Sequence, residues 1–257
     1  MSRADDDRAD LELDGAQMRA LGQAALEGVI AHIESLPDQP ACGDTDAAEL
    51  CRAMREPPPE HGAALEQLLE PLFEQWIPRS FNAAGPGYLA YVPGGGLFPA
   101  AVADLIAGGV NRYTGVWQAA PALVQLEANV LDWMRRWMGL PPGARGLLTV
   151  GGSMAAFNAI LCARERHLGA DIRRGTLYTS TQAHHSVHKS ARLAGIMPDR
   201  VRAVPVDAAL RMDLDALAAA IARDREAGLQ PFLVCSTAGT TNTGAVDPLD
   251  GVAELCA

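Results

Sequence analysis

The sequence predicts an α/β fold, in which a mostly parallel sheet is covered by helices and is preceded by a helical arm. From residue 146 onward, short apolar runs alternate with helical patterns, and such alternation is typical of a parallel sheet with helices on both faces. Loops of small and hydroxyl-bearing residues, or of histidines, follow three of these runs. Open α/β sheets hold their ligands at the carboxyl ends of their strands, so these loops are the first candidates for a binding site.

The first 80 residues show helical patterns only. Apolar residues recur at helical spacing over residues 10–35 and 64–76, and a short helix is predicted over residues 47–54. Pro71 is expected to break or kink the second long helix, because proline has no backbone N–H. We therefore predict an N-terminal helical arm over residues 1–80.

A larger domain is predicted to occupy residues 81–257. It opens with a loop rich in glycine and aromatic residues, 82–96, which is either a pocket-lining loop or a plain surface connection. Helices are predicted over residues 99–107 and 123–138. Apolar side chains at helical spacing predict that the second helix has a buried face, formed by Leu126, Val130, Trp133, Met134 and Trp137.

The strands and helices of the sheet follow in alternation. Strands are predicted over residues 147–150, 177–180, 201–206 and 232–235, and helices over residues 153–167, 184–194 and 213–227. Asp213 and Gly228 are suitable caps for the last of these helices. A final helix is expected after Asp247-Pro248.

Composition limits the class of protein. A formal net charge of -10 argues against a nucleic acid or an anionic membrane as partner. The acidic N-terminus is unlike a signal peptide, and no apolar run approaches the roughly 18 residues of a membrane span. We therefore expect a cytoplasmic protein with no membrane association. An odd number of cysteines without paired spacing indicates buried thiols in a reducing compartment; these are Cys42, Cys51, Cys162, Cys235 and Cys256.

The first loop contains Gly151-Gly152-Ser153, between a predicted strand and a predicted helix. Free amides and the positive end of the helix dipole favour an anion there, so the pattern predicts a phosphate cradle or, alternatively, a simple helix cap. It lacks the lysine of a P-loop and the third glycine of a dinucleotide fingerprint. A hydrolase elbow would need a glycine where Ala155 stands, and no histidine follows His188 to complete a triad.

The second loop contains His184, directly after a predicted strand. A histidine there can stack on a cofactor ring or move a proton, and a purely structural histidine is the alternative. His184 and His188 could share a helix face and bind a metal, but no glutamate lies between them and no third ligand is evident. We predict no metal site.

The third loop, residues 236–249, combines hydroxyl residues with Gly239 and Gly244. With it, five segments in this order resemble the group II pyridoxal-phosphate-dependent amino-acid decarboxylases, which include aromatic-L-amino-acid and glutamate decarboxylases. The segments are Tyr88-Leu-Ala-Tyr-Val-Pro93, Ala120-Pro-Ala-Leu-Val-Gln-Leu-Glu127, Gly151-Gly-Ser153, Gln182-Ala-His184-x-Ser186 and Gly239-Thr-Thr-Asn-Thr-Gly-Ala-Val-Asp-Pro248.

This resemblance implies a fold, a reaction and an assembly. The fold is the large domain of a type I pyridoxal-phosphate-dependent transferase, similar to aspartate aminotransferase and incomplete here. The implied protein is a lyase that decarboxylates an amino-acid substrate with pyridoxal 5'-phosphate. It would be a homodimer across which the N-terminal helices pack.

The resemblance also assigns site residues by their matching positions. Gly152 and Ser153 correspond to the cofactor-phosphate site. His184 corresponds to the catalytic ring that stacks on the cofactor, and Thr241 to a threonine beside it. Tyr91 and Val92 correspond to the substrate pocket.

The family's Schiff-base lysine and the aspartate that holds the pyridine nitrogen match no residue of the 257. The chain has a single lysine, Lys189, and five helical residues place it roughly 140° from His184. The chain alone is therefore expected to be inactive. Two alternatives stay open: another type I reaction, such as aldol cleavage or β-elimination, and a non-catalytic remnant that keeps the cofactor-phosphate loop.

Overall fold

The computed structural model describes residues 13–43, 46–90 and 94–257. The chain divides into two compact units, Met1–Val110 and Asn111–Ala257, and each is described by itself. None of the helices in the described ranges is long and apolar enough to cross a membrane.

The described part of the first unit contains the helices predicted within residues 10–35, 47–54, 64–76 and 99–107. Its helices are α1 (Gly15–Ser35), α2 (Ala47–Ala53), α3 (Leu65–Pro71) and α4 (Phe98–Val110). The side chain of Asp14 accepts hydrogen bonds from the amides of Ala16 and Gln17, each at 2.8 Å. The Gln17 side chain bonds back to the Asp14 amide, which completes a capping box and fixes where α1 begins.

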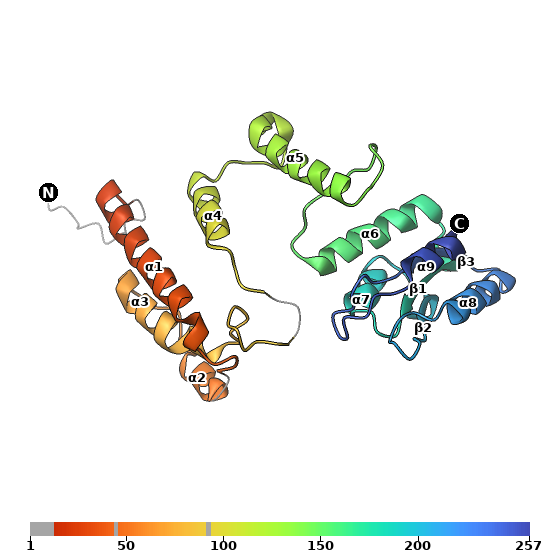
Figure 1. The fold of residues 1–257 in the computed structure, drawn as a ribbon. Helices are drawn as coiled ribbons and strands as arrows, with labels where there is room; N and C mark the ends of the chain where they lie inside the picture. The colour runs from red at the N-terminus through yellow and green to blue at the C-terminus, as the bar shows by residue number, and fades with distance from the viewer. Residues whose placement is uncertain (1–12, 44–45, 91–93) are drawn as a thin grey trace. The chain divides into compact units, whose positions relative to one another are not determined.

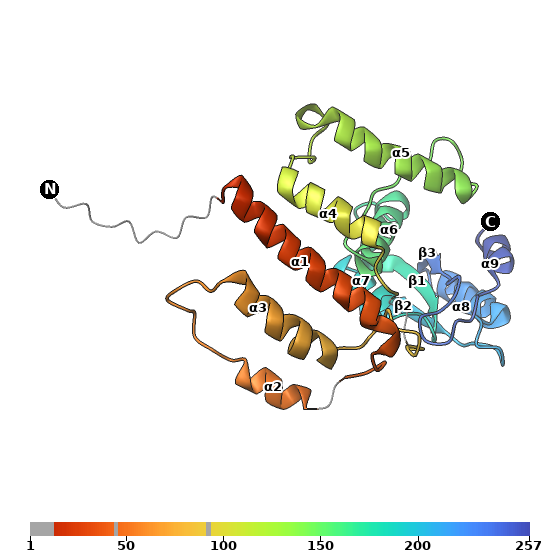
Figure 2. The same ribbon diagram turned by 60° about the vertical axis from the view of Figure 1, so that its left-hand side comes forward.

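Pro71 ends the α-helical part of α3, as its missing N–H predicts. The chain continues as a π-helical turn, Leu72–Trp76, and a 3-10 turn, Ile77–Arg79. Helices α1 and α3 lie side by side in both ribbon views (Figure 1, Figure 2).

The second unit contains a parallel sheet with the strand order β2-β1-β3. Its elements are α5 (Pro121–Trp137), α6 (Gly152–His167), β1 (Gly175–Ser180), α7 (Ser186–Leu193), β2 (Val201–Val204), α8 (Leu214–Glu226), β3 (Gln230–Cys235) and α9 (Leu249–Cys256). Strand β2 is shorter than predicted, because residue 206 pairs only in an isolated bridge with Met212.

Each face of the sheet has its own apolar core, because successive side chains of a strand point to opposite faces. Leu177 of β1 packs with Ile160 of α6 and Ala191 of α7. Its neighbour Tyr178 packs on the other side with Leu217 of α8 and Val252 of α9. Strands β1 and β2 accordingly lie between α7 and α8 in Figure 1. The predicted α/β fold with helices on both faces is confirmed.

One predicted strand is absent. Residues 147–149 have no regular secondary structure and Val150 lies in a bend, and Val150 is 93% exposed. A strand needs a hydrogen-bonded neighbour, and no segment in the described ranges pairs with these residues. Helix α6 therefore begins from coil in the described structure.

The predicted buried face of α5 is also wrong for the chain as described. Leu126, Trp133 and Met134 are exposed, and Trp137 is 78% exposed, while Val130 is half-buried. Helical spacing predicts which side of a helix is apolar, but burial requires a second surface to pack against.

The prediction that the cysteines are buried is also wrong for most of them, since all but Cys235 are exposed. Burial raises the pKa of the Cys235 thiol to about 11.

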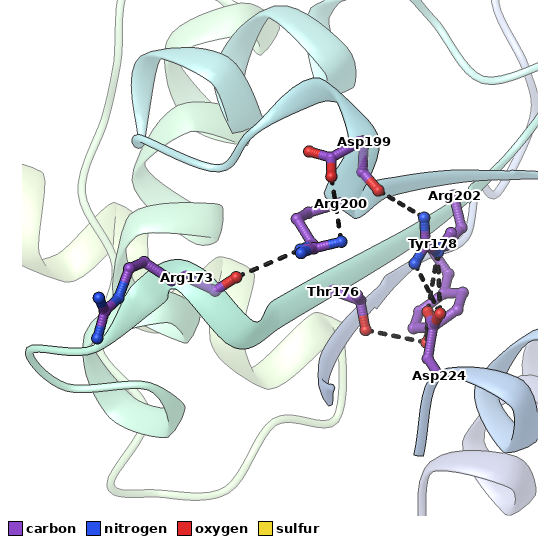
Figure 3. Close-up of polar contacts among 7 residues, drawn as sticks. All are labelled: Arg173, Thr176, Tyr178, Asp199, Arg200, Arg202 and Asp224. Atoms are coloured by element: carbon purple, nitrogen blue, oxygen red, sulfur yellow. Dashed lines mark hydrogen bonds and ion pairs between the residues drawn. The ribbon is translucent and has the colours of Figure 1, made fainter. Parts of the chain in front are cut away.

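A buried polar network joins the middle of the sheet to α8 (Figure 3). The Tyr178 hydroxyl donates to Oδ2 of Asp224 at 2.6 Å, and Arg202 of β2 donates from Nη2 to Oδ1 at 2.6 Å. The hydroxyl of Thr176 lies 3.0 Å from that of Tyr178. Burial raises the pKa of Tyr178, and the hydrogen bond to Asp224 raises it further. Burial alone would raise the pKa of Asp224, but the hydrogen bonds from Arg202 and Tyr178 outweigh it and the pKa is lowered.

The replacement Asp224→Asn is expected to lower the free energy of unfolding by about 2 kcal/mol at pH 7, because it leaves the half-buried Arg202 without its carboxylate. A carboxyl whose pKa is lowered on folding stabilises the protein at pH values above the pKa that it has in the unfolded chain, here 3.8. That stabilisation disappears as pH falls through the lower folded value. Urea unfolding should therefore show a gap between wild type and variant at pH 7 that closes below about pH 4.

The matched control is Glu226→Gln, which removes an exposed carboxylate from the same helix. It should change stability by less than about 0.5 kcal/mol. A gap for Asp224→Asn that is no larger than this, or that stays constant with pH, would contradict the role given to the network.

Candidate functional site

Two of the predicted loops meet at the carboxyl edge of the sheet. Because β1 and β3 are parallel neighbours, the loops that follow them emerge at the same edge. The side chain of Asn242, after β3, donates to Oε1 of Gln182, after β1, at 3.1 Å. Gln182 lies two residues before His184, and Asn242 directly follows Thr241. The structure thus brings the His184 and Thr241 loops together.

The beginning of α6 lies at this edge as well. Its last residue, His167, accepts a hydrogen bond at its carbonyl from Gln230, where β3 begins. Sixteen helical residues span about 24 Å, slightly more than a six-residue strand at about 20 Å. The first turn of α6 therefore reaches the carboxyl edge, where Ser190 of α7 donates to the Ser153 carbonyl at 3.2 Å.

The first turn of α6 has free amide groups. The amides of Met154 and Ala155 both donate to the Gly151 carbonyl, while those of Gly152 and Ser153 have no acceptor within the described part of the chain. No side chain caps this helix. Helix α8 differs, since the Asp213 carboxylate accepts from its first turn. An uncapped helix start favours an external anion.

The residues of this turn fit a phosphate group. Gly151 has a φ of 102°, a conformation that side-chain-bearing residues rarely adopt. A Cβ built at Gly151 or Gly152 would meet no other atom within 4 Å, so the space beside the amides is open. Ser153 is exposed, and its hydroxyl can add a donor to the amides. The sequence-derived phosphate cradle is therefore sterically available.

His184 precedes α7 and is exposed. Its Nδ1 lies 2.9 Å from the Ser186 hydroxyl and accepts the Ser186 amide at 3.3 Å. The ring of His185 is 4.1 Å away, centroid to centroid, at an angle of 43°. Across the described ranges, no three side chains of the metal-binding types come together around an ion position.

Thr241 lies at the exposed tip of a tight turn. The amide of Thr240 donates to the Ala245 carbonyl at 2.9 Å, and that of Gly244 donates to the Thr240 carbonyl at 2.8 Å. The hydroxyls of Thr240 and Thr243 are 2.7 Å apart. This bonding fixes the turn and leaves the Thr241 side chain to face outward, available to a ligand.

Comparison with known proteins decides the family. The model of the pyridoxal-dependent decarboxylase conserved domain matches residues 49–257. The chain belongs to this family. The predicted resemblance to the group II decarboxylases is therefore confirmed, and the cofactor of the family is pyridoxal phosphate.

Several of the similar proteins are named as decarboxylases of aromatic amino acids. An aromatic-L-amino-acid decarboxylase of Bacillus atrophaeus is 35% identical over 96% of this chain and 51% of its own length. L-tyrosine/L-DOPA decarboxylase 2 of Lophophora williamsii is 32% identical over 95% of the chain and 48% of its own. A crystal structure of Oryza sativa TDC with PLP and tryptamine matches with a TM-score of 0.88 at 28% identity, over 96% of this chain and 54% of that one. The chain spans about half the length of the curated relatives it matches.

Two positions predicted for the decarboxylase substrate pocket, Tyr91 and Val92, lie outside the described residues. Lys189 is exposed on α7. It lines a hollow of about 330 Å³ together with His188, Arg192, Ile196, Pro198 and Val201. None of the predicted cofactor residues lines this hollow. The helix predicted over residues 184–194 begins only at Ser186, so His184 precedes it and the helical angle predicted between His184 and Lys189 does not apply.

Asp247 was not among the site residues predicted from the sequence. It is 2% exposed, and its carboxylate accepts from the amides of Met212 at 2.7 Å and Thr237 at 2.8 Å. Asp247 thereby joins the loop after β3 to the strand-like segment after β2. The sequence offered one signal, an acid within an apolar Ala-Val-Asp-Pro stretch, but it reads equally well as the start of a helix.

The replacement Asp247→Ala is expected to lower the free energy of unfolding by about 3 kcal/mol, because it leaves the buried amide of Met212 and the half-buried amide of Thr237 without acceptors. Chemical denaturation of the two proteins measures this difference. Asp250→Ala, at an exposed position in α9, is the control and should cost less than about 1 kcal/mol. Equal losses for the two variants would show that Asp247 does not hold the loops together.

Proposed function

We propose that the full-length protein is a pyridoxal-phosphate-dependent decarboxylase of an aromatic L-amino acid. Membership of the decarboxylase family supports the reaction, and the two similar curated proteins support the substrate class. The observation that carries the proposal is the uncapped first turn of α6, which lies beside α7 at the edge of the sheet where the His184 and Thr241 loops meet.

Gly152 and Ser153 would hold the cofactor phosphate through their free amides and the Ser153 hydroxyl, because the helix dipole adds to these donors. Pyridoxal phosphate, when bound, supplies an electron-withdrawing ring that stabilises the negative charge left by the departing carbon dioxide. His184 would lie against that ring and limit its movement. Thr241 would approach from the neighbouring loop, and Tyr91 and Val92 would line the substrate pocket.

The assembly we propose is a cytoplasmic homodimer. An N-terminal arm, residues 1–80, would contribute to the dimer, and residues 81–257 would form the first part of the cofactor-binding domain. Exposed apolar side chains such as Leu105 of α4 and Trp137 of α5 support an association that covers them. Light scattering of the purified full-length protein should give the mass of two chains, whereas the mass of one chain would contradict this assembly.

The reaction is tested by carbon dioxide release from the full-length protein with added pyridoxal phosphate. We expect release from tyrosine, tryptophan or DOPA and at least about 100-fold less from glutamate, because a pocket for an aromatic ring leaves a buried carboxylate unpaired. Release from glutamate at a comparable rate would overturn the substrate class. If none of the amino acids releases carbon dioxide, the proposed reaction is wrong.

We also propose that the 257-residue chain alone does not decarboxylate amino acids, because its single lysine, Lys189, faces the separate hollow. Borohydride reduction of the chain with pyridoxal phosphate, followed by peptide mapping, should give no stoichiometric label. Stoichiometric labelling of Lys189 together with carbon dioxide release would contradict the proposal.

A further inference from the structure

Ser186 lies directly against His184 at the start of α7. The residue is only 7% exposed, and its hydroxyl oxygen is 2.9 Å from Nδ1 of the histidine ring. No second partner of this hydroxyl occurs in the described ranges. A buried hydroxyl nearly always uses its hydrogen, so the ring nitrogen is where that hydrogen goes.

The backbone amide of Ser186 decides which way the bond runs. This amide points at the same Nδ1, at 3.3 Å, and a backbone N–H can only donate. Nδ1 must therefore accept, which means that it carries no proton and that the neutral ring has its hydrogen on Nε2. A proton on Nδ1 would face the amide hydrogen and leave the amide without an acceptor.

We propose that Ser186 is a positioning residue that fixes the tautomer and the plane of the His184 ring. The two donors of Ser186 hold Nδ1 as an acceptor, and the ring then offers Nε2–H as its donor on the exposed side of the loop. This inference rests on the proposed function in so far as His184 acts at the cofactor. A ring that is fixed in one plane and one tautomer loses less freedom when a ligand binds against it.

Nitrogen-15 NMR of the 257-residue chain, labelled at its six histidines, observes the tautomer directly. His184 is assigned by the signal lost in His184→Asn. In the neutral ring we expect Nδ1 of His184 to be unprotonated and Nε2 to carry the hydrogen. A neutral wild-type ring with its proton on Nδ1 would overturn the inference without any further variant.

Two variants and a control then test the contribution of the hydroxyl. Ser186→Ala should move the ratio of Nε2–H to Nδ1–H about fivefold toward Nδ1–H, as loss of one hydrogen bond implies. Ser186→Thr keeps a hydroxyl and should retain the wild-type ratio. The control is Ser190→Ala, which removes another buried hydroxyl of α7, one that bonds the Ser153 carbonyl and not His184. An unchanged ratio in Ser186→Ala overturns the inference.

Activity of the full-length protein separates this inference from the proposed function. We expect kcat of Ser186→Ala to fall about fivefold, with Ser186→Thr restoring it. If the tautomer shifts in Ser186→Ala but neither Ser186→Ala nor His184→Ala lowers kcat, the positioning by Ser186 stands and the role of His184 at the cofactor fails. If His184→Ala lowers kcat while Ser186→Ala changes neither kcat nor tautomer, the proposed function stands and the inference fails.

Discussion

Replacing Ser153 with glutamate in the full-length protein is expected to weaken pyridoxal-phosphate binding by about 100-fold. A carboxylate about 4 Å from a phosphate costs about 4 kcal/mol at an effective dielectric constant of about 20, and the exposure of this turn reduces that cost. The change also opposes the helix dipole, which favours the cofactor anion. Titration of the apoenzyme with the cofactor, followed by absorbance, gives the dissociation constant.

The matched control is Ala159→Glu, which adds the same charge at an exposed position of the same helix. Six residues place it about 9 Å further along the axis, so its effect should be less than threefold. Equal weakening by the two variants would indicate a general charge effect. Unchanged affinity in Ser153→Glu would remove α6 from the binding site.

Replacing His184 with alanine is expected to lower kcat of the full-length protein by about 100-fold while the cofactor stays bound. Loss of a positioned ring affects the orientation of the reacting groups, and misplacement of that kind costs factors of about this size. The phosphate cradle lies on α6, whereas His184 lies in the loop before α7, so cofactor affinity should fall much less. Steady-state kinetics and the cofactor titration together separate the two effects.

His188→Ala is the control for this variant, since His188 is exposed on α7, the helix that follows His184, and lines the separate hollow. It should retain kcat within about twofold. If His184→Ala instead lowers the melting temperature and keeps its activity per folded molecule, His184 is a structural residue and its catalytic assignment is wrong.

Local features of the fold were predictable from the sequence. Asp213 caps α8, and its side chain accepts from the Ala216 amide at 2.9 Å. At Pro71 the α-helical pattern changes to a π-helical turn, because a proline affects the hydrogen bonds within one turn of itself. Gly151 precedes α6 with the positive φ that a glycine permits. In each case the residue that carries the signal and the structure that it determines lie within a few positions of each other.

Features that depend on distant partners were not predictable. An apolar run at residues 147–150 has strand composition, yet strand formation depends on a neighbour elsewhere in the chain. The apolar face of α5 has the same dependence. Asp247 and Met212 are 35 residues apart, so no local sequence pattern predicts their hydrogen bond. The meeting of Gln182 and Asn242 follows from the strand order, which the sequence does not specify.

The central claim is that the free amides of the first turn of α6 bind the cofactor phosphate. The most direct measurement is an amide chemical-shift titration of the 257-residue chain with pyridoxal phosphate, monitored by proton–nitrogen NMR. We expect the amides of Gly152 and Ser153 to shift saturably, while those of Leu214 and Asp215, at the helix start capped by Asp213, stay unchanged. Unmoved Gly152 and Ser153 signals at saturating cofactor, or equal shifts at both helix starts, would contradict the account.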